Sequence, residues 1–193
     1  NHKSTLLIEG DLDKNLDKFN NLSGIDLVFG GPPCQGFSVA GKMDIHDPRS
    51  KLVFSFLEVV KRVLPKAFIM ENVKALGSLD KFSGIRQEIA NQASQMGYRV
   101  SLIQLNAKDF GVPQSRERIF IIATKKQAFD FNTIEKKPLV TVADAISDLH
   151  FLVSGDGQFL QDYPTLPQSD YQLEMRKNSE KLYNHQATNH NAV

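Results

Sequence analysis

The only cysteine of the chain, Cys34, stands in the stretch FGGPPCQGFS, which runs from Phe29 to Ser38. Two prolines precede it, and because proline locks its own φ and restricts its neighbours, they fix the direction of the thiol. Backbone amides facing the sulfur would favour the thiolate, which is a nucleophile. An isolated cysteine is usually a small buried apolar residue, but this rigid setting favours a reactive thiol.

Two further groups of polar residues are typical of a site. Glu71 of ENV follows the apolar run AFIM, where a partly desolvated carboxylate can hold or donate a proton near neutrality. The alternative is a capping acid that begins the next segment. Arg116 and Arg118 of QSRER would point the same way in an extended chain and suit phosphate or carbonyl oxygens. Their alternative is a solvated run of charges.

Composition narrows the class of protein. The 193 residues allow one domain with a sizeable core, and 41% hydrophobic and 23% charged residues are typical of a soluble globular protein. The net charge of +1 neither supports nor excludes nucleic acid, so a DNA-binding face would be a local basic patch. One cysteine cannot form an internal disulfide, and no apolar run is long enough to span a bilayer. We therefore expect a cytoplasmic protein without a membrane partner.

The apolar pattern alternates between strands and helices. Residues 25–29 indicate a buried strand, residues 51–64 a helix that Pro65 ends, and residues 67–70 the next strand. This order predicts a βαβ unit with parallel strands. Residues 85–96 predict another helix, and 98–105 and 119–123 two more strands, so we expect an open α/β sheet. Cys34 and Glu71 then follow strand ends at one edge of the sheet, where ligands bind in such folds.

The two ends of the chain have a different character. TLLIEGD, residues 5–11, indicates a strand that runs into a loop, and its abrupt start suggests a piece of something larger. Residues 141–149 predict a short helix, and from Phe151 onward Gly, Pro, Gln and Asn dominate without a sustained period. His185 and His190 resemble a metal-binding pair, but without a third ligand no metal is expected.

Taken together, GGPPCQGFS, ENV and NAKDFGVPQSRERIF, in this order and spacing, resemble the DNA cytosine-5 methyltransferases of bacterial modification systems. The match runs from EGDL, residues 9–12, to RIFII, residues 118–122. The resemblance implies the open, mostly parallel, Rossmann-like sheet of the S-adenosylmethionine-dependent methyltransferases, incomplete here and followed by an irregular tail. It also implies a partial catalytic domain over residues 1–136 and a connection toward a target-recognition domain over residues 137–193.

The resemblance assigns catalytic roles. In this family a cysteine, here Cys34, adds to carbon 6 of cytosine, so that carbon 5 attacks the methyl group of S-adenosylmethionine. The glutamate of ENV, here Glu71, holds ring nitrogen 3 and the exocyclic amine. The arginines that match Arg116 and Arg118 contact the base carbonyl, its phosphate and the cysteine loop. Because the chemistry cannot reach a stacked base, the cytosine flips out of the duplex.

The resemblance assigns supporting and cofactor roles only in part. Asn72 would brace the cysteine loop, and Gln114 and Pro33 are further supporting residues. Asp11 would bind the adenine amine of S-adenosylmethionine, and the other implied cofactor contacts are Leu12, Pro33 and Leu52. The Gly-rich turn and the ribose-binding acid of the family do not occur in this sequence, nor do its C-terminal motifs. We therefore expect the isolated chain to bind the cofactor poorly.

The implied partners are double-stranded DNA, a cognate restriction endonuclease and a second chain that completes the fold. Contacts to DNA are expected from the loop 35–49, which would close over the flipped nucleotide, through Gln35, Ser38, Lys42 and Arg49. One alternative is a truncated, inactive or split-subunit fragment that keeps the fold and the DNA contacts but needs further sequence for cofactor binding. Folate-dependent methylation of pyrimidine nucleotides also uses a cysteine at carbon 6, but enzymes of that kind lack ENV and QxRxR in this arrangement.

Overall fold

The computed structural model describes residues 5–33 and 52–190, and they form two compact units. The first unit comprises residues 1–105 and 117–134, and the second comprises residues 106–116 and 135–193. In the described ranges no helix is both long and apolar enough to cross a membrane.

A four-stranded sheet with the order β1-β2-β4-β3 organises the first unit. Its strands are β1 (Leu27–Gly30), β2 (Ala67–Val73), β3 (Arg99–Asn106) and β4 (Glu117–Thr124). β1 and β2 are parallel, which confirms the predicted βαβ unit. β4 runs antiparallel to β2 and lies between β2 and β3 in the sheet. β2 continues three residues beyond the apolar run that predicted it, so that ENV forms the last three residues of the strand.

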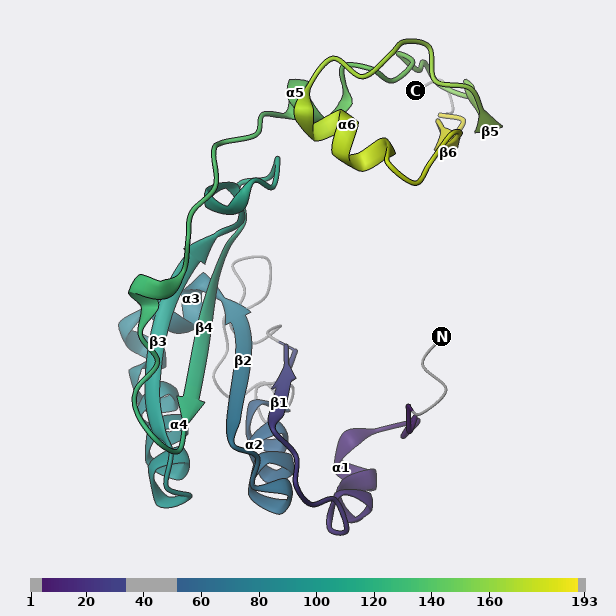
Figure 1. Ribbon diagram of the computed structural model, residues 1–193. Coiled ribbons are helices and arrows are strands. Elements are labelled where there is room, and N and C mark those ends of the chain that lie inside the picture. The colour runs from purple at the N-terminus through teal and green to yellow at the C-terminus, as the bar shows by residue number, and fades with distance from the viewer. Residues whose placement is uncertain (1–4, 34–51, 191–193) are drawn as a thin grey trace. The chain divides into compact units, whose positions relative to one another are not determined.

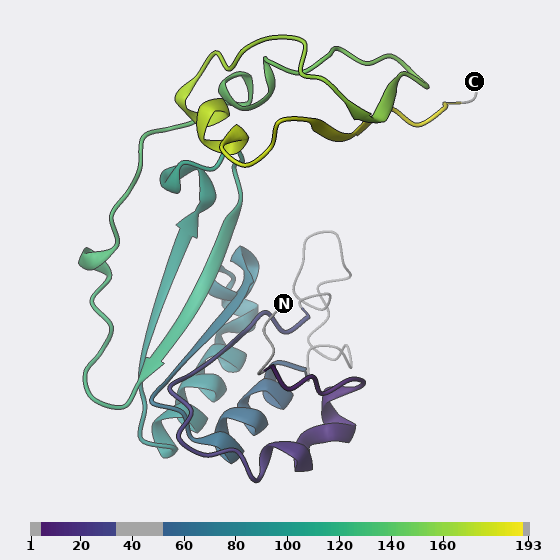
Figure 2. The ribbon, with the colours of Figure 1, turned by 45° about the vertical axis from the view of Figure 1, so that its right-hand side comes forward.

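Helices cover one face of this sheet (Figures 1 and 2). They are α2 (Leu52–Val63), α3 (Lys74–Ser78) and α4 (Ser83–Gln95), and the short α1 (Leu12–Asn15) precedes β1. α2 buries one apolar face and carries Lys61 and Arg62 in its last turn, where the helix dipole favours positive charge. α4 ends as predicted at Gly97, whose φ of 83° is accessible to glycine without strain.

The core fills the space between these helices and the sheet. β2 alternates, so that Phe68, Met70 and Asn72 are buried toward the helices, whereas Glu71 lies on the opposite face. The fully buried apolar side chains come from α2, β2, α3, the 3₁₀ turn Asp80–Phe82, α4 and β4; they are Val53, Leu57, Val60, Phe68, Met70, Leu76, Phe82, Ile89, Ala93, Ile119, Ile121 and Ala123.

Tyr98 closes the core at the start of β3. Its hydroxyl donates to the carbonyl of Pro65 at 2.6 Å, and its ring meets that of Phe68 edge to face at 5.3 Å. Burial raises the pKa of Tyr98 to about 12, so the phenol remains a hydrogen-bond donor at neutral pH. This contact fixes the turn that joins α2 to β2.

The second unit contains more regular structure than the expected irregular tail. It comprises a 3₁₀ turn (Ala107–Phe110), α5 (Val142–Ile146), β5 (Gly157–Gln161), α6 (Asp170–Arg176) and β6 (Leu182–Gln186). β5 and β6 form an antiparallel pair that no apolar period predicted, because most of their side chains are exposed and need not be apolar. α5 confirms the helix predicted in residues 141–149, and it begins with a capping box of Thr141 and Asp144.

A buried ion pair holds the second unit together. Arg176 pairs with Asp148, which is 3% exposed, and its guanidinium carbon lies 3.6 Å from the ring centroid of Tyr163. Arg176 also donates to the carbonyl of Thr165 at 2.8 Å. These contacts join α6 to the segments that follow α5 and β5, where apolar side chains such as Phe151 and Leu166 are exposed.

The strand predicted for residues 5–9 was wrong. These residues have no strand conformation, and Leu6 and Leu7 are 71% and 81% exposed. An apolar run becomes a strand only where a partner offers hydrogen bonds, and no strand of the described chain lies beside it.

We predict that Gly77→Ala destabilises the first unit. A Cβ at Gly77 would overlap Cγ2 of Ile119, because α3 lies directly on β4. Overpacking of this kind costs about 1–3 kcal/mol in free energy of unfolding, measurable by urea denaturation. Gly84→Ala is the matched control, because nothing lies within 4 Å of a Cβ there. Equal stability of both variants would contradict the predicted close approach.

Candidate active site

Glu71 and Arg118 form an ion pair between β2 and β4. Glu71 Oε1 lies 2.9 Å from Arg118 Nε, and the two side chains are 35% and 24% exposed. The pairing register places Arg118 opposite Val73, so Glu71 and Arg118 are diagonal neighbours on the same face of the sheet. Arg118 Nη1 also donates to the carbonyl of Glu117 at 2.8 Å. Two contacts thus orient the guanidinium of Arg118: the carboxylate of Glu71 and the carbonyl of Glu117.

The turn after β1 lies against the same carboxylate. A Cβ on Gly31 would come within 3.1 Å of Glu71 Oε2, so glycine leaves the space that this oxygen needs. On the other face of β2, the buried Asn72 donates from Nδ2 to the carbonyl of Pro32 at 3.2 Å. Its Oδ1 accepts from the amide of Val73 at 2.9 Å, which fixes the orientation of the amide group. β2 therefore holds the GGPP turn from both faces.

Several predicted residues lie outside the described part of the chain. They are Cys34 and the expected DNA contacts Gln35, Ser38, Lys42 and Arg49. The described chain stops at Pro33, the residue before the cysteine, and resumes at Leu52.

A cleft of about 550 Å³ lies at the carboxyl end of β1. All four residues expected to contact the cofactor line it: Asp11, Leu12, Pro33 and Leu52. The volume is within the usual range for small-molecule sites, and the lining is mainly apolar. Gly30, Gly31, Pro32 and Phe56 complete the lining. The structure thus brings together residues from three separate segments of the sequence.

Phe56 also lines this cleft, although the sequence indicated nothing for it beyond its place in the predicted helix 51–64. It lies one helical turn after Leu52, so both residues share a face of α2. A Cβ on Gly30 would lie 3.1 Å from Cε2 of Phe56, and the ring therefore packs against the end of β1. The spacing of Leu52 and Phe56 was the available signal, but an apolar residue on a buried helix face is normally read as core.

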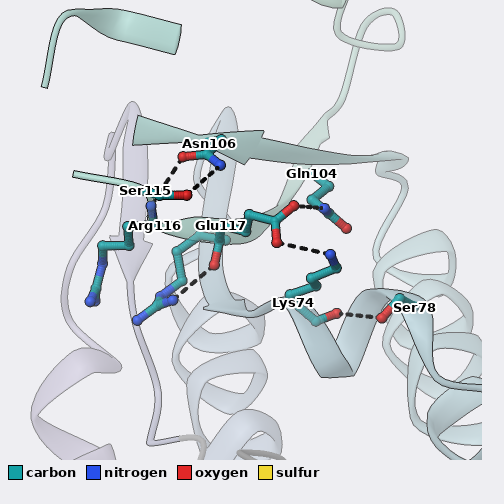
Figure 3. Close-up of polar contacts among 8 residues, drawn as sticks. Lys74, Ser78, Gln104, Asn106, Ser115, Arg116 and Glu117 are labelled. Carbon is teal, nitrogen blue, oxygen red and sulfur yellow. Dashed lines mark hydrogen bonds and ion pairs between the residues drawn. The ribbon is translucent and has the colours of Figure 1, made fainter. Parts of the chain in front are cut away.

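Arg116 and Gln114 belong to the second unit, and both are exposed. Asn106 fixes the backbone there: its Oδ1 accepts from the amide of Arg116 at 3.0 Å, and its Nδ2 donates to Ser115 Oγ at 3.4 Å (Figure 3). The carbonyl of Arg116 accepts from the amide of Ala107 at 3.0 Å. The common direction of Arg116 and Arg118 stays a prediction.

Metal ligands do not cluster in the described ranges, where no three His, Cys, Asp or Glu side chains come together. Nε2 of His185 lies 2.8 Å from the carbonyl oxygen of His150, and the amide of His190 donates to Ser154 Oγ at 2.8 Å.

The fold defines a class: the protein has the Rossmann-like α/β sheet of the S-adenosylmethionine-dependent methyltransferases. The crystal structure of an E. coli prophage protein assigned as a DNA modification methyltransferase matches 83% of this chain and 48% of its own, with a TM-score of 0.66 and 30% identity. The Entamoeba histolytica methyltransferase EhMeth shares the fold over 78% of this chain and 47% of its own, with a TM-score of 0.55 and 24% identity.

The family follows from the sequence comparison. The model of the C-5 cytosine-specific DNA methylases matches residues 1–192, and the chain belongs to this family. Type II methyltransferase M.DdeI of Desulfomicrobium norvegicum is 42% identical over 88% of this chain. M.AquIA of Picosynechococcus sp. is 42% identical over 77% of it. The chain spans 43% of the length of the first relative and 73% of the second.

Proposed function

We propose that the protein transfers the methyl group of S-adenosylmethionine to carbon 5 of cytosine in double-stranded DNA, as the modification enzyme of a restriction-modification system. One observation carries the proposal: in a chain of this family, the Glu71–Arg118 pair adjoins the turn that leads directly to the only cysteine. The relatives named as type II methyltransferases support the modification role. A truncated or split-subunit fragment is the alternative, and methyl transfer separates the two.

Cys34 is the proposed nucleophile. Its sulfur forms a bond to carbon 6 of a flipped cytosine, which makes carbon 5 electron-rich enough to take the methyl group. A base then removes the hydrogen of carbon 5, and the carbon–sulfur bond breaks to restore the aromatic ring and the thiolate. The hydrogen bond from Asn72 to Pro32 supports this role, because it anchors the backbone two residues before the thiol.

Glu71 and Arg118 are the proposed partners of the base. Attack at carbon 6 places negative charge on the ring, and a carboxylic acid at ring nitrogen 3 stabilises it by sharing a proton. Glu71 is held by Arg118 on one side and bordered by Gly31 on the other, so its position is set before a base arrives. Arg118 and Arg116 would contact the base carbonyl and the phosphate, and Gln114 would support them.

The cleft at the end of β1 fits the adenine end of S-adenosylmethionine. Leu12, Leu52 and Phe56 offer apolar surface for a flat ring, and Asp11 offers an acceptor for its amine. Pro33 lines this cleft and directly precedes Cys34 in the sequence, which supports a methyl-donor end directed toward the thiol. When bound, S-adenosylmethionine supplies an electrophilic methyl group on a sulfonium; the residues of the cleft bind and orient it.

Methyl transfer tests the function directly. The full-length gene product should move radiolabelled methyl from S-adenosylmethionine to DNA, and Cys34→Ala should abolish it. DNA with 5-fluorocytosine at the target should trap a covalent adduct, because fluorine cannot leave as a proton, and peptide mapping should find it on Cys34. An adduct elsewhere, or methylation by Cys34→Ala, would contradict the proposed nucleophile.

Glu71→Gln should lower kcat by roughly a hundredfold or more, the scale of a positioned acid, with DNA affinity little changed. The amide keeps the shape but cannot share its proton with the ring. Single-turnover methylation and DNA-binding titrations measure the two quantities. Glu58→Gln on the exposed part of α2 is a matched control, and equal losses in both variants would refute the specific role.

Asp11→Asn should weaken binding of S-adenosylmethionine by about tenfold, the scale of one hydrogen bond to a charged group. Asp11 caps α1 by accepting from the amide of Asp13 at 3.0 Å. Asparagine caps a helix equally well, so stability should not change. Titration calorimetry on the full-length protein measures the affinity, with Asp13→Asn as control. Unaltered affinity of Asp11→Asn would remove Asp11 from the cofactor site.

A further inference from the structure

A polar cluster of Lys74, Gln104 and Glu117 lies at the start of β4 (Figure 3). Lys74 Nζ lies 2.8 Å from Glu117 Oε2, and Gln104 Nε2 donates to Glu117 Oε1 at 2.8 Å. Both carboxylate oxygens of Glu117 are therefore held, one from α3 and one from β3. Lys74 is itself part of a closed turn, because its carbonyl accepts from Ser78 Oγ at 3.2 Å.

The position of this cluster follows from the strand register. β2 and β4 pair from Ala67↔Thr124 to Val73↔Arg118, where the ladder ends. The next pair in the same register would be Lys74 and Glu117, but the chain leaves the strand at Lys74 to begin α3. The side-chain ion pair thus connects the two residues that backbone hydrogen bonds no longer join.

The cluster is coupled to Arg118 through the backbone of Glu117, which precedes Arg118 in the chain and accepts a hydrogen bond from its guanidinium. Alternation along β4 directs the Glu117 side chain toward α3 and the Arg118 side chain toward Glu71. The carbonyl of Glu117 accepts from Arg118 Nη1 at 2.8 Å. A shift at Glu117 therefore moves both the backbone that carries Arg118 and an acceptor that orients its guanidinium.

We propose that Glu117 is a positioning residue: held by Lys74 and Gln104, it fixes Arg118 and thereby the carboxylate of Glu71. The inference rests on the proposed function of Glu71 and Arg118. Lys74 and Glu117 are 49% and 39% exposed, and ion pairs with this exposure add little to stability. A displacement of about 1 Å in a catalytic group can nevertheless cost a hundredfold in rate. The cluster therefore contributes more to the position of Arg118 than to the stability of the fold.

The test compares Glu117→Ala with the double charge reversal Lys74→Glu with Glu117→Lys. Glu117→Ala should lower kcat by about tenfold and change KM for DNA by less than about twofold. The variant loses the placement of Arg118 and Glu71, whereas its contacts with DNA remain. The reversal re-forms the ion pair, and Gln104 can turn its amide to accept from the new lysine. It should restore kcat to within about threefold of wild type. Asp26→Asn, which breaks the ion pair between Lys66 and Asp26 at the other end of β2, is the matched control and should leave kcat unchanged.

Hydrogen exchange of residues 115–120 supplies a readout that is independent of activity. Exchange should be faster in Glu117→Ala and return toward wild type in the charge reversal. If the wild type methylates DNA, and Glu117→Ala has the same kcat and the same hydrogen exchange as the wild type, the positioning role alone is overturned. Absence of methylation by the wild type would instead refute the proposed function, and the exchange pattern would still decide whether Glu117 fixes the start of β4.

Discussion

The antiparallel pairing of β2 with β4 is the constraint on which the rest of the structure depends. Seven residues of β2 pair in one register, and that register places Glu71 diagonally across from Arg118. A slip of β4 by one residue against β2 would turn Arg118 to the other face, toward the core under α2 and α3, and would separate it from Glu71. The close contact of Gly77 with Ile119 adds a second restraint on this register, because it fits only where α3 crosses β4 at that residue.

The two faces of β2 differ in role, because successive side chains along a strand point to opposite faces of the sheet. Phe68 and Met70 build the core with the helices, and Asn72 on that face ties the GGPP turn to the strand. Glu71 on the opposite face stays partly exposed and meets Arg118. A core of this kind holds the backbone of β2 in place and thereby positions the proposed catalytic carboxylate of Glu71. One seven-residue strand therefore contributes both to the core and to the proposed site.

Family membership indicates which reaction these contacts could support, and the geometry alone does not. A carboxylate paired with an arginine near a turn suits several reactions, since fold and local geometry leave the substrate open. The match over residues 1–192 shows that the chain belongs to the C-5 cytosine-specific DNA methylases, and it supports the proposed cytosine-5 chemistry. The cleft lined by Asp11, Leu12, Pro33 and Leu52 agrees with a methyl donor bound beside the cysteine-bearing turn.

The sequence by itself determined the βαβ unit, the presence of α2 and α4 and the signals that end them, and the identity of the motif residues, because apolar periodicity, Pro65 and Gly97 are local signals. It also indicated the family through three short motifs. It did not determine that ENV lies within β2, that residues 5–9 form no strand, or that β5 pairs with β6, because pairing depends on partners far along the chain. The double contact of Phe56, with the core and with the cleft, likewise needs the packing of α2 on β1. Only the tertiary structure decided the Glu117 cluster: Lys74, Gln104 and Glu117 have ordinary surface residue types and meet because two strands and a helix converge at one point.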